Sequence, residues 1–259
     1  MSVAPLGLFL LFALLVYAPL VLTNRIVGRG DLLTYFYPYR DYASSVLRLG
    51  RLPLWNPYLF MGVPFLANSQ AGVLYPLNLL LAWLPVTRAV NLSIAGHAFL
   101  AALGSFLLAR RLGLGRVTAA LSGLLFGFGG TLTAQAEHLN QLQGLAWLPW
   151  LLWLYERSRL SHGRGGLNVG RIAPAAVVLA LQLLAGHTQS AFISLVGLAA
   201  WALVEGWDDL RHDAGLRRTL GEWLATVGGI AGLAGLLAAA QVLPTWELSR
   251  LSIRAGGLP

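Results

Sequence analysis

Long apolar runs are the feature that most restricts what this chain can fold into. A helix that spans a membrane needs about 20 mostly apolar residues, and the sequence contains several runs near this length. Only 11% of the 259 residues are charged, whereas soluble domains carry about 25% charged residues. The sequence therefore predicts an all-α, polytopic membrane protein with about seven transmembrane helices. These lie near residues 5–22, 89–109, 117–136, 139–155, 172–186, 188–204 and 223–243.

Positive charge between the runs predicts how the chain is oriented. Arginine in short loops marks the cytoplasmic side of a membrane protein, and all 18 basic residues here are arginine. The turns at Glu137 and His187 contain none, and dividing the run 172–204 into two helices at the sequence GHTQS puts every basic loop on one side. We therefore expect the N-terminus in the cytoplasm. The basic loops are 110–116, 156–171 and 205–221.

Composition excludes several classes of function. The net charge of +8 is not arranged in a basic stripe or a nucleic-acid-binding motif, so we expect no nucleic-acid partner. The chain contains no cysteine, which excludes disulfides and thiolate chemistry. Residues 1–24 contain no charged side chain. The basic segment that opens a signal peptide is therefore missing, and 5–22 is interpreted as the first membrane helix.

The segment 23–88 is expected to form one large extracytoplasmic loop that contains amphipathic surface helices. Pro38 is typical of the first turn of a helix, which would end near Gly50. We expect this helix to lie along the membrane surface, where tyrosine is enriched. The short run 77–84 is expected to lie in or dip into the same interface. One face of the predicted helix carries Tyr35, Tyr39, Tyr42, Val46 and Leu49, at helical spacing.

Three ionisable residues of the outer face form the candidate site. Asp31 either caps the loop helix or is held at the membrane surface as a general base or a metal ligand. Glu137 and His138 are the ionisable side chains of the next outer turn, where they form either a polar rim at the interface or one site with Asp31. Two carboxylates and an imidazole on one face can bind a divalent cation or share acid–base work. If they form one site, they lie close together in the fold.

Other polar residues have both a structural and a substrate-binding interpretation. His97, in the run 89–109, is predicted to hydrogen-bond to a neighbouring helix, and Asp41 is interpreted as a solvated charge. In the outer loop, Trp55 is able to stack on a sugar ring and the amides to bind hydroxyl groups. The alternative is a rigid loop whose prolines fix its path. The amides are those of Asn56, Asn68 and Gln70, and His187 and Gln189 mark the third outer turn.

Four stretches of the chain carry a family resemblance. One is YFYPYRDYASSVLRLGRLPLWNPYLFMGVPF in the outer loop, with the specific part LPLWNPY, and the others are HLNQLQGLAWLPWLLWLYE, GHTQSAFISL and QVLPTWELSRLSIRAG. Together they resemble the YfhO family of bacterial multi-pass membrane proteins, which is similar to the GT-C superfamily of membrane glycosyltransferases. The resemblance implies one GT-C-like module in the bacterial cytoplasmic membrane. Family members are commonly several times longer, so we expect this module to be truncated at its C-terminus.

The resemblance implies transfer of a sugar from a polyprenyl-phosphate-linked donor to a glycan or glycolipid acceptor of the cell envelope. It implies Asp31, Glu137 and His138 as catalytic residues, with Asp31 as the base that activates the acceptor hydroxyl. The donor phosphate suits an arginine. The alternatives are a transporter or flippase for lipid-linked sugars and a noncatalytic partner subunit of a glycosylation complex. Candidate substrate-binding residues are Arg40, Arg51, Arg88, Trp55, Asn56, Asn68, Gln70, His187 and Gln189.

Overall fold

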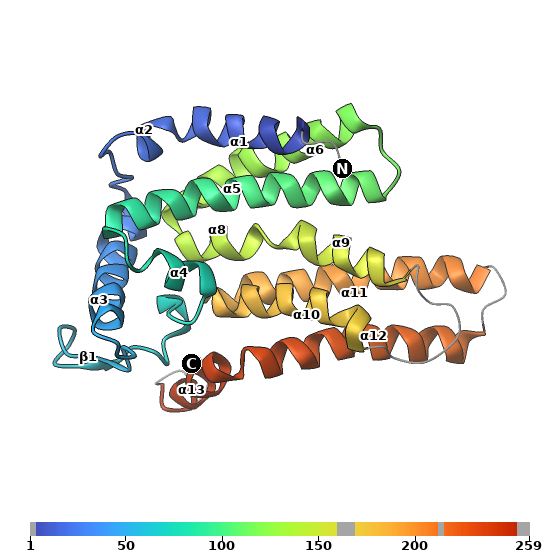
Figure 1. Cartoon of the computed structure of the whole chain (residues 1–259). Coiled ribbons are helices and arrows are strands. Elements are labelled where there is room, and N and C mark those ends of the chain that lie inside the picture. Colours follow the sequence, from blue (N-terminus) through green and yellow to red (C-terminus); the bar gives the residue numbers. More distant parts are fainter. Residues whose placement is uncertain (1–3, 160–168, 212–214, 253–259) are drawn as a thin grey trace.

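A computed structural model shows a bundle of helices and describes residues 4–159, 169–211 and 215–252. Apart from one hairpin of short antiparallel strands, the regular structure in these ranges is helical (Figure 1), so the predicted all-α class is confirmed. In chain order the first elements are α1 (Ala4–Val16), α2 (Ala18–Val21), η1 (Leu32–Phe36), α3 (Tyr37–Arg48), β1 (Trp55–Asn56), β2 (Val63–Pro64), η2 (Ser69–Ala71), α4 (Pro76–Leu81) and α5 (Val86–Arg111). The later elements are α6 (Arg116–Phe128), α7 (Gly130–Ala134), η3 (Gln135–Glu137), α8 (Leu139–Leu145), α9 (Leu148–Arg159), α10 (Val169–Leu184), α11 (Thr188–Arg211), α12 (Leu216–Leu237) and α13 (Ala239–Arg250).

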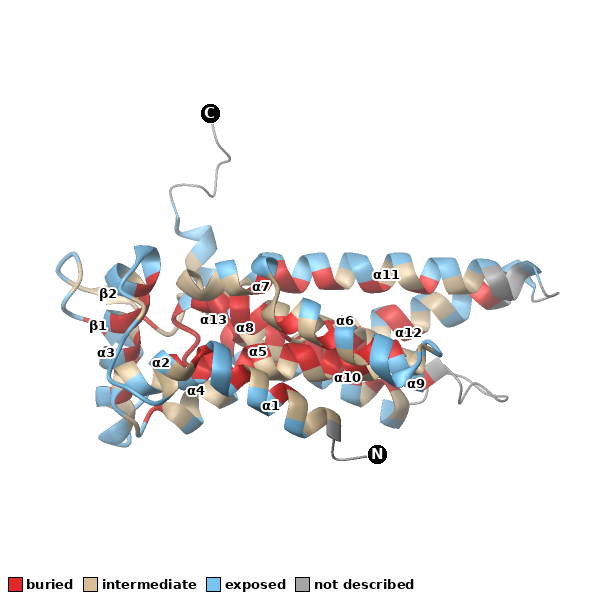
Figure 2. Ribbon diagram, turned by 90° about the horizontal axis from the view of Figure 1, so that it is seen from above, coloured by how far each residue is buried: buried red, intermediate tan, exposed pale blue. Residues whose placement is uncertain are grey.

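Within the described ranges, four helical stretches are long and apolar enough to cross a membrane. Several such helices are compatible with a multi-pass membrane protein, and the number of seven spans stays a prediction. In α5, 67% of the apolar segment is buried inside the protein, whereas the buried share of the other three segments is 22% to 28%. The helix α5 is therefore the central helix of the bundle, and the other three expose apolar surface (Figure 2). The four stretches are Val86–Arg111, Arg116–Glu137, Thr188–Trp207 and Thr219–Leu237, and shorter apolar helices are Pro5–Val16 and Val169–Leu184.

Gly186 marks the turn between α10 and α11. Its φ of +90° is a left-handed conformation that glycine commonly adopts just beyond the end of a helix. The predicted division of the run 172–204 into two helices is thereby confirmed. A Cβ atom on Gly186 would lie 2.0 Å from the carbonyl oxygen of Ser69, so glycine also allows this turn to touch the outer loop.

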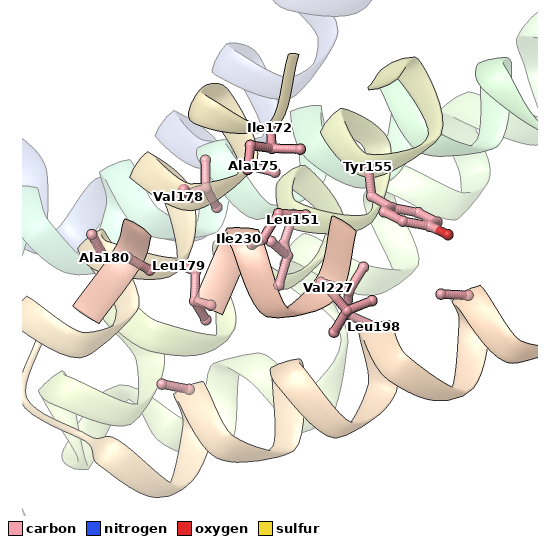
Figure 3. Packing of buried hydrophobic residues seen from close by; sticks show 14 of the residues in the cluster. Leu151, Tyr155, Ile172, Ala175, Val178, Leu179, Ala180, Leu198, Val227 and Ile230 are labelled. Atoms are coloured by element: carbon pink, nitrogen blue, oxygen red, sulfur yellow. The ribbon is translucent and has the colours of Figure 1, made fainter. Parts of the chain in front are cut away.

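The core between α9, α10, α11 and α12 is built from apolar side chains (Figure 3). Leu151 of α9, Leu198 of α11 and Ile230 of α12 are fully buried there. On α10, small residues such as Ala175 allow close helix packing. Within a membrane such helices are held together by close van der Waals packing, because lipid is as apolar as these side chains.

At one end of the bundle, α3 runs crosswise to α5 (Figure 1). The helix that Pro38 predicts is confirmed, because α3 covers Tyr37–Arg48. Its aromatic face packs on the outer loop: the rings of Tyr39 and Tyr42 lie 5.1 Å and 4.9 Å from the ring of Phe65, which is fully buried. These two tyrosines therefore contact their own chain, where the sequence suggested contact with the membrane interface.

The outer loop is also held by α13, which follows it much later in the chain. The Gln241 side chain donates a 2.7 Å hydrogen bond to the carbonyl of Leu66. The Thr245 hydroxyl donates a 2.9 Å hydrogen bond to the carbonyl of Ala67. Gln241 is buried, so its bond is shielded from water. Together these contacts fix the segment that leads into η2.

Candidate functional site

Asp31 lies at the start of η1, directly after a glycine turn. Gly30 adopts a φ of +50°, which glycine reaches without steric strain. The Asp31 side chain is 63% exposed and makes no capping hydrogen bond to the backbone of η1. The capping interpretation of Asp31 is therefore wrong.

Two side-chain contacts join the first outer loop to the second outer turn. A carboxylate oxygen of Asp31 lies 3.2 Å from Nδ1 of His138. Nε of Arg29 lies 3.5 Å from a carboxylate oxygen of Glu137. Asp31 therefore lies close to Glu137 and His138, as the one-site interpretation of the sequence requires. A Cβ atom on Gly30 would lie only 2.7 Å from the Glu137 carboxylate, so a side chain at this position would displace the carboxylate.

A pocket of about 170 Å³ lies beside the Asp31–His138 contact. Its walls come from η1, η2, α8 and the turn before α11, which are far apart in the sequence. One carboxylate, two imidazoles, three amides and a tyrosine hydroxyl offer both hydrogen-bond donors and acceptors to a ligand. The pocket is lined by Asp31, Tyr35, Phe36, Gln70, His138, Asn140, Gln141 and His187.

His187 brings the second imidazole to the pocket. Its Nδ1 accepts a hydrogen bond from the backbone N–H of Ser190 at 3.2 Å, so Nδ1 carries no proton and the Ser190 hydroxyl, 2.6 Å away, donates to it. Burial and, secondarily, the charge of nearby His138 lower the pKa of His187. The neutral ring is therefore favoured, with its proton on Nε2.

Asn68 supports the wall of the pocket without lining it. Its Nδ2 donates to the Tyr35 hydroxyl at 2.9 Å, and its Oδ1 accepts from the backbone N–H of Gln70 at 3.2 Å. Burial is the main cause that raises the pKa of Tyr35, so its hydroxyl stays protonated. Among the outer-loop amides that the sequence singled out, Gln70 is the one that reaches the pocket.

The hairpin residues do not line this pocket. Asn56 is buried, and its Oδ1 accepts from the backbone N–H of Tyr58 at 3.0 Å. Trp55 is exposed. Neither residue is among the pocket-lining residues, and the same holds for Arg51 and Gln189. Substrate contacts at these positions stay predictions.

Two arginines that the sequence offered for the donor phosphate bind groups of the protein itself. Arg40 is 8% exposed, and its Nη1 donates to the carbonyls of Ala71 and Gly72 at 2.9 Å and 3.1 Å. Arg88 donates to a carbonyl at 3.2 Å and to a side-chain amide at 3.3 Å, both near the end of the first apolar run. Both side chains therefore hold the outer loop in place.

Arg29 is the candidate that sequence analysis missed. Its side chain is 83% exposed, and it stands directly before Gly30 and Asp31. The available signal was the sequence GRGD, in which an arginine lies between two glycines just ahead of the candidate base. An exposed guanidinium beside the Asp31–His138 contact is available to a phosphate group.

A chain of buried hydrogen bonds fastens the outer loop to the helices. Nδ1 of His97 lies 2.7 Å from the Ser93 carbonyl and donates to it, so Nε2 accepts from the Tyr75 hydroxyl, also at 2.7 Å. The Trp147 indole N–H donates to the same hydroxyl at 2.7 Å. The ring partner predicted for His97 was a neighbouring helix, and the structure places that partner in the outer loop.

Gln143 extends this chain of buried hydrogen bonds. Its Nε2 donates to Oδ1 of Asn78 at 2.8 Å and to the Ser93 hydroxyl at 2.9 Å. Gln143 is fully buried, so these bonds join α8 to α4 and α5 out of contact with water. No local sequence pattern indicates this contact.

The site offers few ligands for a metal ion. In 4–159, 169–211 and 215–252, no group of three or more His, Cys, Asp or Glu side chains is placed to hold one. Asp31 and His138 contact each other, and Glu137 contacts Arg29. The sequence suggested a divalent cation as one option. These ranges contain no complete set of His, Cys, Asp or Glu ligands for it.

No protein-family model matches the chain, and no curated protein or solved structure matches it either. The chemistry of the site therefore has to be inferred from its own residues. A carboxylate in contact with an imidazole can accept a proton from a hydroxyl. An exposed arginine can bind an anion, and amides can bind the hydroxyl groups of a sugar.

Proposed function

We propose that this chain transfers a sugar from a polyprenyl-phosphate-linked donor to an acceptor hydroxyl of the cell envelope, at the outer face of the bacterial cytoplasmic membrane. The observation that carries the proposal is the 3.2 Å contact between Asp31 and His138 beside a pocket of about 170 Å³. The resemblance to the YfhO family, and through it to GT-C glycosyltransferases, agrees with this chemistry. In this orientation the N-terminus and the basic loops lie in the cytoplasm.

In the proposed reaction, the Asp31–His138 pair takes the proton of the acceptor hydroxyl. The acceptor oxygen then forms a bond with the anomeric carbon of the donor sugar. The bond between that carbon and the phosphate oxygen breaks, and its electron pair leaves with the lipid phosphate. A positioned general base typically contributes about 10²–10⁴-fold to such a rate.

Arg29 supplies positive charge for the leaving phosphate in this proposal. Its guanidinium can form two parallel hydrogen bonds with a phosphate. Nε of Arg29 lies 3.5 Å from the Glu137 carboxylate, and the side chain is 83% exposed. The exposed Nη groups are therefore the groups assigned to the donor phosphate.

The position of the pocket supports a lipid-borne donor. Tyr35 and Phe36 of the pocket wall lie directly before α3, which runs crosswise at the end of the helix bundle (Figure 1). If the apolar helices cross the membrane, this end of the bundle lies at its surface. A polyprenyl chain can then stay in the bilayer while its phosphate and sugar reach the pocket.

The test uses the full chain in lipid vesicles, supplied with a panel of polyprenyl-phosphate sugars and an extract of cell-envelope acceptors. We expect loss of one donor and release of its lipid phosphate. Asp31→Asn should slow the consumption of the donor by about 10²–10⁴-fold, because asparagine cannot act as the base. Asp41→Asn is the matched control, since Asp41 is exposed on α3 and is absent from the pocket lining.

Three results would count against the proposal. Donor loss that is equal in the wild type and in Asp31→Asn would remove the assigned base. Movement of the donor across the vesicle membrane without its consumption would support a flippase instead. A third outcome is that no donor reacts and that Asp31→Asn does not alter donor binding. The pocket would then not have this function.

A further inference from the structure

A second, smaller cavity lies beside Arg40 and shares no lining residue with the pocket at Asp31. Its volume is about 20 Å³, which is room for about one particle of the size of a water molecule. The polar residues around it are Arg40, Ser44, Asn78 and Ser93, and the rest of the lining is apolar. No Asp or Glu lines it.

Arg40 brings an unneutralised charge to this cavity. The side chain is 8% exposed, and its Nη2 is buried without a hydrogen-bond partner. In the described part of the chain, no carboxylate forms an ion pair with it. Burial lowers the pKa of Arg40 to about 10, so the guanidinium is still charged at pH 7. A buried charge normally requires a partner of opposite charge.

The hydrogen-bond donors around the cavity are also arranged for an anion. Oδ1 of Asn78 accepts the 2.8 Å bond from Gln143, and Nδ2 donates to the Gly72 carbonyl at 2.9 Å, so one Nδ2 hydrogen remains for an anion. Arg40 lines the cavity and has an unpartnered Nη2. The Ser44 hydroxyl is a further donor in the lining.

We propose that the cavity beside Arg40 binds a small monovalent anion, chloride in the cell. Chloride supplies the missing negative charge and accepts hydrogen bonds from the surrounding donors. A water molecule fits the volume but leaves the guanidinium without a counter-charge. A phosphate group is larger than the cavity, so this site is distinct from the proposed donor site. The anion would lock α3 and α4 onto α5.

The first experiment compares the melting temperature of the purified full chain in sodium chloride and in sodium gluconate at equal ionic strength. Gluconate is too large to enter. We expect chloride and bromide to raise the melting temperature by about 5 °C, with saturation as the site fills, and sulfate to have no such effect. Equal melting temperatures in chloride and gluconate would overturn the proposal and assign a water to the cavity.

The second experiment assigns the effect to Arg40. Arg40→Met should abolish the difference between chloride and gluconate. Arg48→Met is the matched control, because Arg48 also binds loop carbonyls, at 2.9 Å and 2.6 Å, but does not line the cavity. It should lower the melting temperature and keep the dependence on chloride. A chloride effect that survives in Arg40→Met would place the anion elsewhere.

A third measurement covers the case in which Arg40→Met does not fold. Crystals of the wild-type chain grown in bromide should show an anomalous peak beside Nη2 of Arg40. Absence of that peak would overturn the proposal. None of these readouts depends on sugar transfer, so the anion site and the proposed function stand or fall separately.

Discussion

The outer end of the molecule and the core between α9 and α12 are held together by different forces. In the core, Leu151, Leu198 and Ile230 pack against apolar neighbours (Figure 3). At the outer end, buried polar groups such as Tyr75 and His97 bind one another across distant parts of the chain. Apolar packing has no preferred direction, whereas each hydrogen bond requires its partner in one place.

This difference predicts where the chain tolerates amino-acid substitutions. An apolar core accepts another hydrophobic side chain of similar volume with little loss of stability. A buried polar group that loses its partner destabilises the fold by its full desolvation energy, about 1–3 kcal/mol. The outer end is therefore the region in which a single altered atom has the larger effect, and it is also the region that contains the candidate site.

The largest expected contrast between the two regions is in activity. Asp31→Asn and His138→Gln should each lower sugar transfer by about 10²–10⁴-fold. The double variant should lose little more than either single one, because the pair is proposed to act as a unit. Leu198→Met, in the apolar core, should transfer sugar at nearly the wild-type rate. Donor consumption in vesicles measures all four variants, and additive losses would show that Asp31 and His138 act independently.

Deletion of one heavy atom in each region gives the next contrast. Tyr75→Phe removes the hydroxyl that joins the half-buried Trp147 to the buried His97, so two groups lose a partner and we expect a loss of about 3 kcal/mol in the free energy of unfolding. Ile230→Val removes one methyl group from the core and should lose about 1 kcal/mol. Denaturant unfolding in detergent compares the two. A larger loss for Ile230→Val would reverse the proposed contrast.

Gly30→Ala is expected to have a smaller effect, confined to the outer end. A side chain at a φ of +50° is strained by about 1 kcal/mol. Its Cβ would also press on the Glu137 carboxylate, 2.7 Å away, so the contact between Glu137 and Arg29 should open. Gly28→Ala is the control, because nothing lies within 4 Å of its added Cβ. If both variants unfold at the same denaturant concentration as the wild type, the glycine turn does not fix the site.

The smallest effect concerns pH and His187. Its pKa is lowered in the folded state, so the unfolded chain binds more protons below the ordinary histidine pKa of about 6.5. Its contribution to stability is therefore complete above that pH and is lost as the pH falls from about 6.5 through the lower pKa of the folded state. His187→Gln should reduce the fall in melting temperature between pH 7 and pH 5.5 by about 1 °C. An unchanged fall would show that His187 is not responsible.

Much of the architecture could be predicted from the sequence, because it follows from the length and spacing of apolar runs. The apolar runs indicated where several long helices lie, but the predicted helix 139–155 is divided into α8 and α9, and the predicted helix 223–243 covers the end of α12 and the start of α13. The glycine and polar residues at 186–190 located the turn between α10 and α11. The same reasoning placed Asp31 and His138 at matching ends of two runs, and their 3.2 Å contact agrees with it. Their catalytic role stays a proposal.

The contacts of individual side chains could not be predicted in the same way. The spacing of apolar residues along α3 does not predict that the Arg40 side chain points into the fold and binds the carbonyl of Ala71. The hydrogen bond between Tyr75 and His97 joins two residues far apart in the chain. The periodicity of neighbouring residues does not predict such a pairing. The role of Arg29 depends on its contact with Glu137, which is more than 100 residues away in the chain and cannot be predicted from local sequence. In each case a three-dimensional contact, and not a local pattern, decides the role.

The two hydrogen bonds from α13 to the outer loop have a consequence for biosynthesis. Gln241 and Thr245 follow their partners Leu66 and Ala67 by 175 and 178 residues. A ribosome that adds about 5–20 residues per second therefore takes roughly 10–40 s to supply them after the loop has been made. Through that interval the two loop carbonyls must be satisfied by water or by another protein. The part of the chain that emerges early is fastened late, by the helix that follows every other described helix.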